Sequence, residues 1–323
     1  MTTEQRKREI FDQPCAFKLV YSPEHGINAH VIVRGPDGWH IFYGNNDPPN
    51  HNRAKLHATS EDLLSWTTQE PVLHSGPSGA LDHYELDNNS VIEHDGKWYL
   101  LYFARPTAQA SRRMCLAVSD DLWHWRKIPD ENTAVFIPSS SWSGWTEDAG
   151  PQYCKDPWVI RHQDRFIMYY SCRNKHGDGC VAVASSEDLI HWQDDGPVVT
   201  TRWITDPLVG PGGFEEPRVV QRDGKFYLFV SYFWGWQYAI GDDPFHFGPF
   251  KVMGPWHSSN MFRDGERWYI SHVMQNAGKA NVRASKRKPF RGLYLAGLVW
   301  AGDYPFVTDL QDVMEGWPEE REE

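Results

Sequence analysis

One pattern occurs five times in the chain and is clearest in Val91-Ile92-Glu93-His94-Asp95-Gly96-Lys97-Trp98-Tyr99-Leu100-Leu101-Tyr102. An apolar pair is followed by a polar turn and then by a strand that begins with an aromatic residue. Asp-Gly between two β-rich runs is a strong hairpin signal, because glycine tolerates the positive φ that a tight turn needs. In the other copies the leading aromatics are Trp39, Phe166, Phe226 and Trp268. Each copy therefore predicts a β-hairpin.

A second motif, Ser-X-Asp-Leu-X-X-Trp, follows the first three copies at residues 60–66, 119–125 and 186–192. A short strand-like segment precedes each motif, so every unit holds a hairpin and at least one further strand. Five such sheets arranged radially close into a propeller. A β-sandwich could also carry hairpins, but five copies of one unit argue against it. The sequence thus predicts an all-β fold, a five-bladed β-propeller with four-stranded antiparallel blades around a central channel.

No linker divides the chain, which predicts a single propeller domain over residues 1–323. We expect residues 1–20 to form an N-terminal arm and residues 315–323 to form an acidic tail.

The formal net charge of −11 disfavours nucleic acid and membrane surfaces as partners, since both are anionic. No apolar leader or membrane-spanning run is visible, and the five cysteines lack metal-type spacing. We therefore expect a cytoplasmic protein with no cofactor; a structural Ca²⁺ in the channel would have no support from the sequence. The oligomeric state stays open.

Polar and acidic residues stand where the first strand of each copy should enter an apolar core. Aligned on the aromatic strands, the five copies give Asn28-Ala29-His30, Leu86-Asp87-Asn88, Lys155-Asp156-Pro157, Glu215-Glu216-Pro217 and His257-Ser258-Ser259. Burying a lone carboxylate is costly, so carboxylates at matching places in three consecutive copies favour a site over structural pairing. In a propeller these strand starts open onto one face of the channel.

The repeated motifs resemble the blade signature of the clan of glycoside hydrolase families 32, 43 and 68. Lys155-Asp156-Pro157 is similar to that clan's Arg-Asp-Pro motif, and Glu215-Glu216-Pro217 to its Glu-Cys-Pro motif. The resemblance implies that Asp156 supports the transition state and that Glu215 is the general acid. Glu216, one residue along and on the opposite strand face, is a competitor for that role.

The first copy departs from the clan, which carries there an aspartate that acts as nucleophile or base. This chain has Asn28, Ala29 and His30 at that place. Asp87 could have taken over the role, an external nucleophile such as phosphate could attack, or the protein could bind sugar without cleaving it.

The leading hypothesis is a glycoside hydrolase that uses Glu215 as acid, Asp87 as base or nucleophile, and Asp156 as a holder of the ring hydroxyls. By the resemblance, its oligosaccharide or glycoside substrate is a furanoside of fructoside or arabinoside type. The expected substrate-binding residues are Asn28, His30, Asn88, Arg218, His257, Trp145 and Trp234. The alternatives are a glycoside phosphorylase, similar to family 130, and a non-catalytic carbohydrate-binding propeller.

Overall fold

The computed structural model describes residues 16–24, 26–44, 53–202, 204–206, 210–232, 235–254, 256, 259–273 and 292–315. For residues 88, 89, 204–206, 210 and 211 the description covers the backbone alone.

Apart from one two-stranded hairpin, the described strands form five antiparallel sheets, each of which follows one copy of the sequence repeat. The first sheet holds β2 (His30–Gly35), β3 (Gly38–Tyr43), β4 (Ala54–Ser60) and β5 (Thr67–His74). The second holds β6 (Glu85–His94), β7 (Lys97–Arg105), β8 (Arg113–Ser119) and β9 (Trp125–Ile128). The third holds β10 (Lys155–His162), β11 (Arg165–Arg173), β12 (Gly179–Ser186) and β13 (Gln193–Thr201). The fourth holds β16 (Glu215–Arg222), β17 (Lys225–Tyr232), β18 (Gly235–Gly241) and β19 (Lys251–Gly254).

The fifth sheet joins the two ends of the described chain. From the centre of the propeller outward, its first three strands are β20 (Asn260–Asp264), β21 (Arg267–His272) and β22 (Leu293–Ala301). Two short strands share the outer edge of β22: β1 (Lys18–Tyr21) pairs with its beginning and β23 (Tyr304–Thr308) with its end. Part of the expected N-terminal arm is therefore a strand of this sheet. The remaining elements are the hairpin of β14 (Ile204–Asp206) with β15 (Gly210–Gly212), and the short helix α3 (Leu310–Met314).

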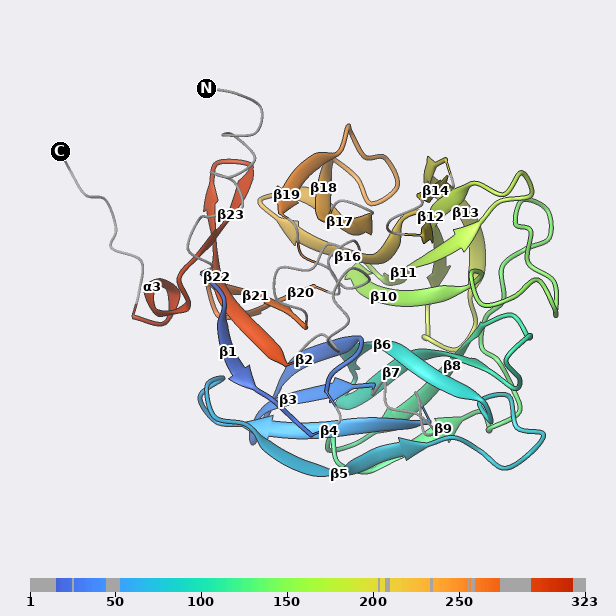
Figure 1. Ribbon diagram of the computed structural model, residues 1–323, viewed down its shortest axis with the longest axis horizontal. Coiled ribbons are helices and arrows are strands. Elements are labelled where there is room, and N and C mark those ends of the chain that lie inside the picture. Colours follow the sequence, from blue (N-terminus) through green and yellow to red (C-terminus); the bar gives the residue numbers. More distant parts are fainter. Residues whose placement is uncertain are drawn as a thin grey trace.

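The inner strands β2, β6, β10, β16 and β20 contact one another in that order, and β20 returns to β2. Figure 1 shows these strands around a common centre with the outer strands of each sheet at the periphery. The five-bladed propeller predicted from the repeats is confirmed.

The buried apolar side chains of the described residues fall into five clusters, each between two neighbouring blades. Val31 and Phe42 of the first blade, for example, pack with Leu86 and Leu100 of the second. A blade therefore buries its faces only against its neighbours, which is the energetic reason that a repeat architecture needs all its units.

Two sequence motifs form the turns that were expected of them. In the Asp95-Gly96 turn both residues have positive φ, 50° and 73°, as a two-residue hairpin turn requires. In the motif at residues 119–125 the carboxylate of Asp121 accepts hydrogen bonds from the backbone nitrogens of Trp123 and His124, each 2.8 Å long. Leu122 enters the core with φ 68°, and its carbonyl accepts the indole N–H of Trp125. The motif thus builds a compact turn between two strands of each blade.

Candidate active site

The starts of three inner strands occupy the same place in successive blades. In each strand one residue near the start is paired to the fifth residue after the leading aromatic of the next strand. The pairs are Asp87 with Phe103, Lys155 with Ser171 and Glu215 with Ser231. A register shift follows immediately in all three strands, so that each carries one extra residue. The alignment of the sequence repeats therefore corresponds to a real structural equivalence around the propeller axis.

The extra residue changes the direction of the carboxylates in the third and fourth blades. Asp156 has φ 59° and Glu216 has φ 53°, a left-handed conformation that is uncommon for residues other than glycine. Bulges of this kind re-aim side chains and are frequent beside active sites. The expectation that Glu216 faces away from Glu215, which assumed regular alternation, is wrong in its premise because the strand is not regular here.

Lys155 joins the carboxylates of the two blades. Its Nζ lies 2.8 Å from Oε1 of Glu215 and 3.5 Å from Oδ2 of Asp156. The same Oδ2 accepts a hydrogen bond of 3.1 Å from the backbone nitrogen of Glu216. Burial alone would lower the pKa of Lys155, but Asp156 and Glu215 outweigh it and raise the pKa, so the ammonium group stays charged.

Glu216 and Arg218 form the deeper part of this cluster. Glu216 is 6% exposed, and its Oε2 accepts a hydrogen bond of 3.0 Å from the hydroxyl of Ser231. Arg218 is 2% exposed, lies 5.0 Å from the ring centre of Trp158, and interacts electrostatically with Glu216 and Asp156. Burial lowers the pKa of Arg218 while the two carboxylates raise it. A guanidinium remains protonated under these conditions, so it balances the buried negative charge.

Asp87, in the second blade, contacts residues of the first blade. Nδ2 of Asn28 donates a hydrogen bond of 2.8 Å to Oδ2 of Asp87. Nζ of Lys55 lies 3.4 Å from Oδ1 of Asp87, and both of these side chains are almost completely buried. Asp87 is thus held by two groups that come from the neighbouring blade.

Arg112 lies between the Asp87 and Asp156 regions. Its Nε and Nη2 bind the two oxygens of Glu85 at 3.0 and 2.7 Å, and Nη1 donates to the carbonyl of Pro151. Burial would lower the pKa of Arg112, but Glu85, followed by Asp156 and Asp87, raises it. A sequence motif marks neither Lys55 nor Arg112, and neither was among the predicted site residues.

The other predicted residues have different surroundings. His30 is 2% exposed, and its Nε2 lies 2.7 Å from the hydroxyl of Ser271 in the fifth blade. Burial, followed by the charges of Arg218 and His272, lowers the pKa of His30 to about 3, so its ring is neutral. A contact of His30 with substrate stays a prediction.

Trp145 is 9% exposed, belongs to the core cluster between the second and third blades, and donates its indole N–H to the carbonyl of Arg112. This buried position does not favour the expected role as a sugar platform, because little of the ring surface is accessible. Trp234 and His257 lie outside the described residues, and for Asn88 the side chain is not described.

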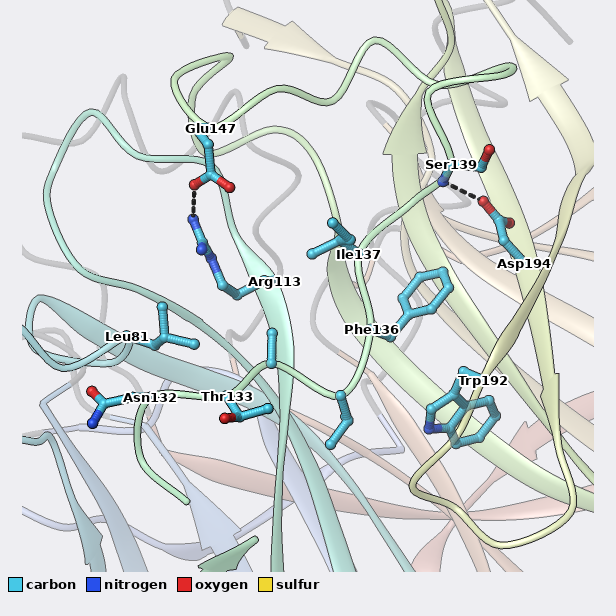
Figure 2. A pocket seen from close by; sticks show the side chains of 12 residues that line it. Leu81, Arg113, Asn132, Thr133, Phe136, Ile137, Ser139, Glu147, Trp192 and Asp194 are labelled. Atoms are coloured by element: carbon cyan, nitrogen blue, oxygen red, sulfur yellow. Dashed lines mark hydrogen bonds and ion pairs between the residues drawn. The ribbon is translucent and has the colours of Figure 1, made fainter. Parts of the chain in front are cut away.

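A cavity of about 530 Å³ lies beside the second and third blades, and Asp87, Asp156 and Glu215 are not among the residues that line it (Figure 2). Arg113, which is paired with Glu147, forms one side of it, while Phe136, Trp192 and Asp194 lie on the other side. None of the predicted site residues lines this cavity, so it is separate from the candidate active site.

Comparison with known proteins identifies the family of the chain. Residues 28–206, more than half of the chain, match the sequence model described as "Glycosyl hydrolases family 32 N-terminal domain". The chain belongs to glycosyl hydrolase family 32. A probable sucrose-6-phosphate hydrolase of Psychromonas ingrahamii is 26% identical over 210 residues, 59% of this chain and 35% of that protein. A sucrose-6-phosphate hydrolase of Salmonella typhimurium is 26% identical over 199 residues, 58% of this chain and 40% of that protein. This family 32 chain therefore spans little more than a third of the length of the curated relatives it matches.

Solved structures show the same fold at low sequence identity. The family 32 β-fructofuranosidase of Bombyx mori superimposes with a TM-score of 0.67 and 17% identity, covering 97% of this chain and 71% of that chain. A thermostable family 43 glycoside hydrolase has a TM-score of 0.67 and 16% identity, covering 89% of this chain and 95% of that one. The predicted resemblance to the clan of families 32, 43 and 68 is confirmed by its family 32 and family 43 members.

Two further findings concern metal ions and membranes. In the part of the chain that the structure describes, no group of three or more His, Cys, Asp or Glu side chains is arranged to hold a metal ion. The helices within the described ranges include none with the length and apolar character needed to cross a bilayer.

Proposed function

We propose that this family 32 chain is a glycoside hydrolase that cleaves a furanoside by carboxylate acid/base chemistry. The observation that carries the proposal is the contact between the third and fourth blades, where Lys155 bridges Asp156 and Glu215. Acids that are distant in the chain thereby become neighbours at one end of the inner strands. Glycosidic cleavage needs such a group of acids, because one must protonate the leaving oxygen while others stabilise positive charge or supply the nucleophile.

A fructoside is the favoured substrate class. The relatives named above are sucrose-6-phosphate hydrolases and a β-fructofuranosidase, and the family match includes the first three blades. An arabinoside is the alternative furanoside, since the fold is shared with family 43 enzymes, including an exo-1,5-α-L-arabinanase.

In the proposed reaction Glu215 gives its proton to the leaving oxygen as the bond from that oxygen to the anomeric carbon breaks. Asp87 attacks the anomeric carbon or removes a proton from the attacking water, and Asp156 binds ring hydroxyls and stabilises the developing positive charge. The pair between Glu215 and Lys155 must open before Glu215 can carry the proton. Glu216, whose carboxylate is bound by Ser231, is the competing acid.

The test is a hydrolysis assay of the purified protein on sucrose, sucrose 6-phosphate and an aryl α-L-arabinofuranoside, with and without inorganic phosphate. We expect sugar release without phosphate, abolished by Glu215→Gln and only reduced by Glu216→Gln. If Glu216→Gln is the inactive variant instead, the acid is reassigned. No turnover of any furanoside under either condition would overturn the enzymatic proposal, and retained sugar binding would then favour the non-catalytic alternative.

A glycoside phosphorylase is the second candidate. It is favoured by the absence of a carboxylate at Asn28-Ala29-His30, since phosphate would then be the nucleophile. The phosphate arm of the same assay distinguishes the two, because a phosphorylase forms a sugar phosphate and needs the added anion.

A cytoplasmic location accompanies the proposal. The four described cysteines, Cys115, Cys154, Cys172 and Cys180, are buried free thiols, as suits a reducing compartment. The proposed reaction assigns no role to a metal ion or organic cofactor. Cell fractionation checks the location directly.

A further inference from the structure

The place of the missing carboxylate is defined by the backbone of the first blade. The backbone nitrogen of Asn28 donates to the carbonyl of Gly44, and the nitrogen of Gly44 donates to the carbonyl of Ala29. Gly44 is the fifth residue after the leading aromatic Trp39, just as Phe103, the partner of Asp87, is the fifth after Trp98. Asn28 and Ala29 both face Gly44, so Asn28-Ala29 occupies in the first blade the place of Asp87-Asn88 in the second.

The first blade nevertheless reaches this carboxylate with two side chains. Asn28 donates to one oxygen of Asp87 at 2.8 Å, and Lys55 lies 3.4 Å from the other. The amide and the ammonium group thus come from the blade that lacks its own acid, while the acid comes from its neighbour.

Lys55 is an unusual residue at this depth. It lies in β4, at a register shift against β5, and its side chain has no exposed surface. Burial lowers the pKa of Lys55, and Asp87 opposes this effect. An apolar side chain of similar volume would serve stability as well as a buried ion pair, because the attraction within the pair is offset by the loss of hydration. The charge of Lys55 is better explained by its effect on the ionisation and orientation of Asp87.

We propose that Lys55 is a positioning residue that, together with Asn28, holds Asp87 ionised and oriented as the replacement for the carboxylate absent from the first blade. The inference rests on the proposed function and extends it to a residue that no motif marks. The charged groups that act on Asp87 include, within the described part of the chain, Lys55 from β4 and Arg112 from the loop before β8. Loss of Lys55 removes the nearer of these two positive charges, so Asp87 would accept a proton at a higher pH.

The experiment compares the pH dependence of kcat/KM for wild type, Lys55→Met, Lys55→Gln and Lys55→Arg. We expect the two neutral variants to lose about tenfold or more in kcat and to shift the acid limb of the profile upward by about one pH unit. Lys55→Arg should restore most of the activity and return the acid limb toward its original position. Lys55→Gln is included because its polar side chain is easier to accommodate if Lys55→Met does not fold.

The matched control is Lys97→Met, which removes one partner of a pair with Asp120 at 3.6 Å on the surface of the second blade. Its profile should coincide with that of wild type. A folded neutral variant of Lys55 with an unchanged acid limb overturns the role of Lys55.

Asp87→Asn separates this inference from the proposed function. We expect it to be inactive. If Asp87→Asn stays active while Glu215→Gln is inactive, the inference fails and the hydrolase proposal stands; if wild type itself is inactive, the proposed function fails first.

Discussion

The backbone nitrogen of Glu216 donates a hydrogen bond of 3.1 Å to Oδ2 of Asp156, so the inner strands of the third and fourth blades are linked through a carboxylate. This carboxylate also lies 3.5 Å from the ammonium group of Lys155. Asp156 therefore has a structural role and a proposed chemical role, and the two can be separated by choice of substitution.

Asp156→Asn should remove the negative charge while keeping an oxygen that can accept from Glu216. We expect kcat/KM to fall by about 100-fold or more, as is typical when one electrostatic stabiliser of a transition state is removed. The melting temperature should change much less than in Asp156→Ala, which loses the acceptor as well. Steady-state kinetics and thermal unfolding of both variants check this, and equal kinetics of wild type and Asp156→Asn would contradict the assigned role.

Lys155→Met should destabilise the fold strongly. The substitution leaves the buried carboxylate of Asp156 and that of Glu215 without their shared cation, and removal of one partner from a buried pair costs about 3–5 kcal/mol. Urea unfolding at neutral pH measures the loss. Lys155→Arg serves as the charge-conserving comparison and Lys97→Met as the exposed one, which should stay within about 0.5 kcal/mol of wild type. A small effect of Lys155→Met would mean that the two acids are hydrated rather than buried.

Acidification below pH 6.5 should destabilise the protein through His30. Its pKa is lowered from 6.5 to about 3, mainly by burial, so between these values the unfolded chain binds a proton that the folded protein does not. The contribution of His30 to the free energy of unfolding has its full value above pH 6.5. It falls by about 1.4 kcal/mol per pH unit between pH 6.5 and the folded-state pKa of about 3. His57, whose pKa burial also lowers to about 3, adds to the same slope.

Unfolding by urea at pH 7.5 and pH 5.0 measures this dependence, with His30→Gln as the comparison. The variant should lose less stability between the two pH values than wild type does. Parallel losses would show that His30 is hydrated or protonated in the folded protein.

Asp121→Ala should lower the free energy of unfolding by about 1 kcal/mol, the usual effect of removing a capping side chain. The carboxylate accepts from two backbone nitrogens and from the hydroxyl of Ser119, and these groups keep the positive φ of Leu122 in place. Asp120→Ala, at the adjacent exposed position, is the control and should have little effect on urea unfolding.

Much of the fold could be predicted because its signals are local. A leading aromatic marks every hairpin, Asp-Gly turns mark four of the five, and repetition of the unit implies a ring. The clustering of Lys155-Asp156 with Glu215-Glu216 could also be predicted, since equal positions in successive repeats meet at the axis. Their detailed directions could not, because the bulges that give Asp156 and Glu216 positive φ depend on strand pairing.

Other parts of the site left no readable signal. Lys55 lies on the third strand of its blade, away from the aligned positions, and a lone lysine in a sequence is normally solvent-exposed. For Trp145 the sequence suggested a role that its position in the structure does not favour. Its position in a segment between blades suggested access to a ligand, but that segment folds back so that the indole packs in the core and binds the carbonyl of Arg112.

The shared outer edge of β22 bears on how the molecule is made. Residues 28–206 contain the first three blades, while the strands that complete the last sheet, β1 and β23, come from opposite ends of the described chain. The apolar side chains of the first blade that face the fifth pack with Tyr269 and Leu293 of that blade and with Leu310 of α3. Residues 28–206 therefore do not cover this face by themselves, and the propeller closes only when the fifth blade is complete.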